Sequence, residues 1–185
     1  MKGINIEENI KNRIIDLITE GSEDRLIVFK PKEDTGAADL VVKKRGEYKP
    51  PIILKRLGVS FKTGRAFSAL PKDRSKELFF QLNIFIGPSE TNSIIKDILQ
   101  EKFVPSKDFY LMFIYFDEVK QDVSNVWLIP SFMFLEIAEP QKLEDNKAIL
   151  RFETTADPKK KDKYSRFLIN QKELGNFLLE TIGTI

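Results

Sequence analysis

Apolar and polar residues follow one another along this chain with two spacings, one typical of helices and one typical of strands. Helical stripes of apolar residues run through 5–20 and 89–99, a short helix is expected at 130–138, and a final helix at 171–182. Six apolar or alternating runs predict strands: 25–30, 39–44, 78–86, 109–116, 125–129 and 148–154. This order predicts an α/β fold, a three-layer sandwich in which helices flank a central mixed sheet.

The run at 109–116 is almost continuously apolar. Strands that are covered on both faces have this composition, so we expect 109–116 to be a central strand. Trp127 is expected to anchor the core, because a large aromatic ring contributes most when it is buried. We prefer that interpretation to a role in stacking on bases. Gly21 is expected to close the first helix.

The segment 46–77 is the most ambiguous part of the chain. A proline pair at 50–51 and two glycines interrupt any long element, although 52–54 has the composition of a brief strand. A length of 185 residues fits one domain with a substantial core. We therefore expect a single domain spanning 1–185, with 46–77 as a basic insertion.

The charge of the chain is uneven, although the net charge is only +2. Between Lys43 and Glu77, eleven Lys and Arg residues accompany three acids, which gives +8 and leaves −6 for the remainder. Basic side chains gain affinity for polyanions by releasing condensed counterions, so the segment predicts a surface for DNA or RNA. A solvated insertion is an equal alternative, because aromatic residues that stack on bases are sparse there. The expected nucleic-acid contacts are Lys55, Arg56, Lys62 and Arg65.

The chain contains neither cysteine nor histidine. Their absence excludes disulfides, thiolate or imidazole metal sites, and Ser-His-Asp hydrolysis. A metal ion would need oxygen ligands, which favours Mg²⁺. No apolar run reaches the roughly 18 residues that span a membrane, and the N-terminus is too polar for a signal peptide, so a cytoplasmic protein is expected.

Polar residues stand at two points within the apolar strands. Because side chains alternate between the faces of a strand, Asp39 shares a face with Lys43, and Gln81 shares a face with Asn83. If the two strands pair, Asp39, Gln81 and Asn83 converge at one end of the sheet. Glu8, or the acids at 33–34, would then supply further oxygen ligands.

These strands resemble the active-site strands of the PD-(D/E)XK, or restriction-endonuclease-like, superfamily. The similar segments are an N-terminal helix, the strand 36–42, the aromatic strand 79–83 with a helix and a strand after it, the segment 127–131 and the stretch 161–164. The resemblance covers most of the chain. It implies a restriction-endonuclease-like fold and a nuclease that depends on Mg²⁺.

The resemblance also implies a role for each candidate residue. Asp39 corresponds to the metal-binding acid, Gln81 stands where the family has Asp or Glu, and Asn83 stands at the catalytic lysine. A lysine at that position stabilises charge on the phosphate, whereas an amide adds no positive charge. Lys43, or a lysine of the basic insertion, would have to replace it, and Glu8 would restore the second carboxylate.

Three hypotheses follow. The first is a nuclease whose lysine has moved, and the second is the same fold without catalysis, binding nucleic acid or a protein partner. The third is an unrelated α/β domain, in which Asp39 and Gln81 only satisfy polar groups within the protein. Strands 39–44 and 78–86 that are not sheet neighbours would favour the third. The oligomeric state is left open, a homodimer included.

Overall fold

The computed structural model describes residues 6–31, 39–61, 77–84, 106–117, 120–138, 140–142, 148–155 and 160–184. Its elements, in chain order, are α1 (Ile6–Gly21), β1 (Leu26–Phe29), β2 (Leu40–Lys44), β3 (Ile52–Phe61), β4 (Glu77–Ile84), β5 (Phe109–Asp117), β6 (Asp122–Pro130), α3 (Ser131–Ile137), β7 (Pro140–Lys142), β8 (Ala148–Thr155), η2 (Ser165–Phe167), β9 (Leu168–Asn170), η3 (Gln171–Glu173) and α4 (Leu174–Thr184). The helix expected at 89–99 lies outside the described residues. No helix in the described ranges combines the length and the apolar character needed to cross a membrane.

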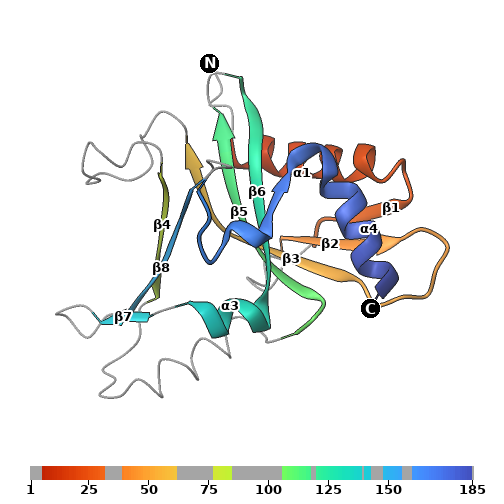
Figure 1. Ribbon diagram of the computed structural model, residues 1–185. Coiled ribbons are helices and arrows are strands. Elements are labelled where there is room, and N and C mark those ends of the chain that lie inside the picture. Colours follow the sequence, from red (N-terminus) through yellow and green to blue (C-terminus); the bar gives the residue numbers. More distant parts are fainter. Residues whose placement is uncertain are drawn as a thin grey trace.

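Six strands form the main sheet, in the order β1-β2-β3-β5-β6-β9 (Figure 1). Strands β1, β2 and β3 pair antiparallel, β3 and β5 pair parallel, and β5, β6 and β9 pair antiparallel. The expectation of an α/β fold with a central mixed sheet is therefore confirmed. Strand β5 lies inside this sheet, and every residue in it is buried except the half-buried Tyr115. The prediction that 109–116 is a central strand covered on both faces is also confirmed.

Strand β3 is longer than the brief strand expected at 52–54, since it continues to Phe61. Its pairing with β5 shifts register between Arg56 and Gly58, which marks a β-bulge or a similar irregularity. A glycine tolerates the backbone of a bulge, so Gly58 does not end the strand. The first half of the expected insertion is thus part of the main sheet, and 62–76 lies outside the described residues.

A second, smaller sheet contains β4, β8 and β7 in that order, all antiparallel. Strand β4 lies here, to the left in Figure 1, and pairs with β8 along its whole length. The expectation that β2 and β4 are neighbours is therefore wrong. Both edges of β2 are already hydrogen-bonded, one to β1 and the other to β3, so no edge is left for β4.

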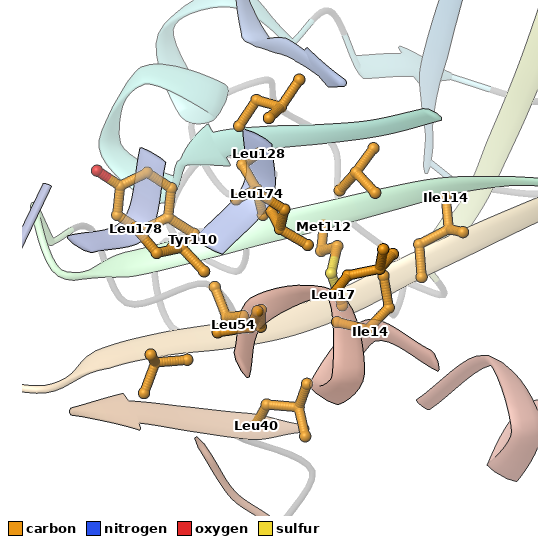
Figure 2. Close-up of a cluster of buried hydrophobic side chains, with 14 of the residues drawn as sticks. Ile14, Leu17, Leu40, Leu54, Tyr110, Met112, Ile114, Leu128, Leu174 and Leu178 are labelled. Atoms are coloured by element: carbon orange, nitrogen blue, oxygen red, sulfur yellow. The ribbon is translucent and has the colours of Figure 1, made fainter. Parts of the chain in front are cut away.

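One core lies between the main sheet and the two helices α1 and α4. It consists mainly of aliphatic side chains, among which Ile14 and Leu17 of α1 meet Met112 and Ile114 of β5 (Figure 2). The residues of α1 in this core recur with the spacing of one helix face, so the sequence predicted its apolar stripe.

The second core lies on the opposite face of the main sheet and is rich in aromatic rings. Phe113 of β5 stacks on Phe152 of β8, with ring centroids 3.9 Å apart and planes 4° apart. Trp127 meets the edge of Phe152 at 6.1 Å and is fully buried, so its predicted role as a core anchor is confirmed. Phe134 of α3 also packs here. In the described residues, the third layer is therefore a small sheet with α3.

Two glycines allow α1 and α4 to approach each other closely. A Cβ atom at Gly175 would lie 2.4 Å from the carbonyl oxygen of Ile18 and 2.4 Å from the amide nitrogen of Ser22. A Cβ atom at Gly21 would lie 3.0 Å from the nitrogen of Gly175. Helix α1 ends at Gly21 as expected, and its end is also the point where the two helices touch.

Candidate functional site

Asp39 stands immediately before β2 and belongs to the hydrogen-bond ladder of the main sheet. Its backbone N–H donates to the carbonyl oxygen of Leu54 at 2.9 Å. The antiparallel register, in which Leu40 lies across from Leu54, places the backbone of Lys55 across from Asp39. The neighbour of Asp39 in the sheet is thus a basic strand, β3, and not the strand that carries Gln81 and Asn83.

A small hollow lies beside Asp39, between α1 and the sheet. Most of its lining is apolar, from Ile10 and Ile14 of α1 and Met112 of β5, and Lys11 borders it. Its interior has room for about one water molecule, which is far smaller than a nucleotide. The hollow therefore provides no cavity for a substrate at Asp39.

Glu8, the expected second carboxylate, takes part in an ion pair on the surface. Its Oε1 accepts a hydrogen bond from Lys30 Nζ at 2.5 Å, and the same ammonium donates to Asn12 Oδ1 at 2.7 Å. The hydrogen bond from Lys30 holds the pKa of Glu8 below its ordinary value. In the described part of the chain, no three Asp or Glu residues lie close enough together to hold a metal ion.

Lys43, the expected replacement for the catalytic lysine, lies over β1. Its Nζ is 5.6 Å from the centroid of the Phe29 ring, a distance that suits a cation–π interaction. Across the ladder, its Cα lies opposite that of Ile27. The ammonium is therefore engaged with the edge strand of the main sheet.

Gln81 and Asn83 lie on β4, where their backbones pair with those of Arg151 and Ile149 in the second sheet. The expectation that strand pairing brings them to Asp39 is wrong, because β4 belongs to the second sheet and β2 to the main sheet. Lys62 and Arg65, the acids at 33–34 and Lys76 lie outside the described residues. Lys55 and Arg56 are placed on β3, beside β2.

The basic residues between Leu40 and Arg56 lie on two neighbouring strands and the loop that joins them. We define the basic hairpin as β2, the loop 45–51 and the start of β3, residues 40–56. It contains six Lys and Arg residues and one acid, Glu47. Lys43, Arg45 and Lys49 are exposed, and the half-buried Lys44 forms a salt bridge with Glu47.

The hydrogen bonds of the basic hairpin hold it in place without cancelling its charge. Arg45 Nε donates to the carbonyl oxygen of Asp24 at 3.0 Å, and Lys49 Nζ donates to the carbonyl oxygen of Gly183 at 3.2 Å. Gly183 is in the last turn of α4, where the partial negative charge of a helix end favours a cation. Because both acceptors are neutral carbonyls, each side chain keeps its positive charge available to a ligand.

The segment 161–164, which contributed to the family resemblance, is tied to its surroundings by Asp162. The carboxylate accepts hydrogen bonds from the Tyr164 N–H at 2.7 Å and from the Thr154 hydroxyl at 2.9 Å. Lys163 Nζ donates to the carbonyl oxygen of Ile137 at 3.0 Å. Asp162 and Lys163 thus connect the segment to β8 and α3.

Comparison of the chain with protein-family models, with curated proteins and with solved structures finds no match.

Proposed function

We propose that this chain is a nucleic-acid-binding α/β domain that contacts phosphates through the basic hairpin and does not cleave what it binds. The observation that carries the proposal is the arrangement of Lys43, Arg45 and Lys49. All three are exposed, and within the described ranges they contact a ring or neutral carbonyls rather than carboxylates. Exposed cations on one hairpin can bind a polyanion, because they displace the counterions condensed on its phosphates.

A restriction-endonuclease-like origin remains part of the proposal. It is supported by the helix α1 ahead of a run of antiparallel strands, and by an acid, Asp39, at the start of the second strand of a mixed sheet. The position of β4 in a separate sheet counts against it and favours an unrelated α/β domain. Binding by the basic hairpin does not depend on which origin is correct.

The absence of catalysis is proposed because, in the described residues, the side chains expected to complete a metal site at Asp39 are placed elsewhere. A Mg²⁺ site needs several oxygen ligands and negative charge, and the expected second carboxylate, Glu8, is paired with Lys30. The amide-bearing strand β4 is not a neighbour of β2. No Mg²⁺ is therefore proposed for this chain, and binding should proceed without a divalent cation.

The test compares two triple charge reversals by measuring the affinity of the full chain for a labelled DNA at low salt. Reversal at the basic hairpin, Lys43→Glu with Arg45→Glu and Lys49→Glu, should weaken binding about tenfold or more, since three phosphate contacts would become repulsive. The matched control changes the net charge equally at exposed lysines elsewhere: Lys107→Glu, Lys120→Glu and Lys172→Glu. Equal losses for the two triples would contradict binding at the basic hairpin.

A cleavage assay with Mg²⁺ and with Mn²⁺ tests the second half of the proposal. We expect intact DNA and intact RNA after incubation with the wild-type chain. Cleavage that disappears in Asp39→Ala would overturn the non-catalytic assignment and support a nuclease centre at Asp39.

A further inference from the structure

Two large apolar side chains of the described residues are markedly exposed, and both lie at the basic hairpin. Phe29 keeps 46% of its surface exposed, and Tyr48 is fully exposed at 110%. Phe29 comes from β1, which precedes the basic hairpin in the chain, and Tyr48 lies in the loop 45–51. Exposed rings that accompany grouped cations need an explanation, because a soluble domain gains by burying such rings.

Phe29 reaches the basic hairpin through the pairing of β1 with β2. Its Cα lies opposite that of Val41, and the ammonium of Lys43 lies over its ring. Strand β1 is an edge strand of the main sheet, and no other strand of the described ranges pairs with it on its outer side. The result is a ring with a positive charge beside it on the open edge of the sheet.

Tyr48 is held out into solvent by an anchored loop. Arg45, on one side of it, is bound to Asp24 in the turn after α1, and Lys49, on the other side, is bound to the end of α4. The backbone that carries Tyr48 is thus fastened at both flanks. Fixing a ring in advance lowers the entropy that a ligand must overcome when it binds.

We infer that the nucleic acid bound by this chain is single-stranded, with bases stacked on Phe29 and Tyr48 and phosphates contacting Lys43, Arg45 and Lys49. The inference rests on the proposed function and names its substrate class. Bases in a duplex are already stacked on one another, so exposed rings gain contact only with unpaired bases. Aromatic rings along a basic groove or stripe are the recognised means of binding single strands of any sequence.

The experiment measures the affinity of the full chain for a labelled oligothymidylate of about 20 nucleotides and for a duplex of the same length. The wild type should bind the single strand more tightly than the duplex. Tyr48→Ala and Phe29→Ala should each weaken single-strand binding by about 5-fold to 150-fold, the effect of one lost base stack. Their duplex affinities should stay within about 2-fold of the wild type, because phosphate contacts remain.

Conservative variants separate loss of stacking from loss of structure. Tyr48→Phe and Phe29→Tyr keep a ring and should bind the single strand like the wild type. Phe29→Leu keeps β1 apolar but removes the ring, so it should bind as weakly as Phe29→Ala even if the alanine variant disturbs the strand.

The outcomes distinguish this inference from the proposed function. Unchanged single-strand affinity in Tyr48→Ala and in Phe29→Leu would overturn stacking, while binding that still depends on the three cations would leave the proposed function standing. Equal affinity for the duplex and the single strand would likewise overturn the substrate class. No binding of either DNA at low salt would defeat both.

Discussion

The contact between α1 and α4 gives the most direct prediction about stability. Gly175→Ala adds one methyl group at a point where the surrounding atoms belong to backbone. The new Cβ would lie 2.4 Å from Ile18 O, 2.4 Å from Ser22 N and 2.5 Å from Gly21 C. Backbone atoms cannot rotate away as a flexible side chain can, so the two helices must separate.

The size of the effect follows from two opposing contributions. An ordinary van der Waals contact begins at 3.4 Å, so the helices must move apart by about 1 Å. Overpacking of this kind typically destabilises a protein by about 1–3 kcal/mol. Alanine favours a helix over glycine by up to about 1 kcal/mol, which offsets part of the loss. With that offset taken in full, we expect Gly175→Ala to lower the free energy of unfolding by up to about 2 kcal/mol in net terms.

Urea unfolding, followed by circular dichroism and by fluorescence, measures this change. Trp127 is the only tryptophan and lies in the aromatic core, so its emission reports on the opposite face of the sheet from α1 and α4. Gly183→Ala is the matched control, because it lies in the same helix with nothing within 4 Å of the new Cβ. It should be neutral or stabilising by up to about 1 kcal/mol. Equal stability of the two variants would refute the close approach of the helices.

Two further predictions concern the packing of α1 and of the second sheet. The hydrogen bond from Arg13 Nε to Asp122 Oδ1, 2.7 Å long, lowers the pKa of Asp122 from its usual 3.8. Its stabilising contribution, at most about 1 kcal/mol for a half-buried pair that still contacts solvent, is therefore present above pH 3.8 and is lost as the pH falls through the lowered value. Asp122→Asn should flatten this part of the curve of unfolding free energy against pH, and an unchanged curve would contradict the pairing. Phe152→Ala should lower the free energy of unfolding by about 3–5 kcal/mol in the same urea assay, because it removes the ring stacked on Phe113; a loss below about 1 kcal/mol would contradict that packing.

Much of the secondary structure was predictable because it depends on local patterns. The continuous apolar run of β5 and the stripe of α1 each have a composition that suits only one environment, buried on two faces or on one. The short helix α3 and strand β8 also lie where the sequence predicts them. These elements could be predicted without knowing which strands or helices they pack against.

The pairing of strands was not predictable, because alternation shows which residues share a face and not which strand lies alongside. Strand β4 has the apolar character of a core strand, yet its neighbour is β8, which comes much later in the chain. Strand β3 was shortened in the prediction because Gly58 was taken as an interruption, whereas it lies at a bulge. The candidate site at Asp39 was predicted from a pairing of β2 with β4. Because β4 pairs with β8 instead, Gln81 and Asn83 lie in a different sheet from the strand that follows Asp39.

Only one of the two exposed rings could be anticipated from the sequence. Tyr48 stands among basic residues and can be noticed there, but Phe29 closes the run Leu26–Phe29, which has the composition of a buried strand. Only the position of β1 at the edge of the main sheet shows that Phe29 is exposed. The close contact at Gly175 also escapes the sequence, since its partners lie in the first helix.

The salt dependence of nucleic-acid binding tests the central claim most directly. The measurement is the association constant of the wild-type chain for oligothymidylate over a range of salt concentrations. Three cations in contact with single-strand phosphates predict that the logarithm of this constant falls against the logarithm of salt with a slope of about −2 or steeper. A slope near zero, or no binding at low salt, would contradict a polyanion surface on the basic hairpin.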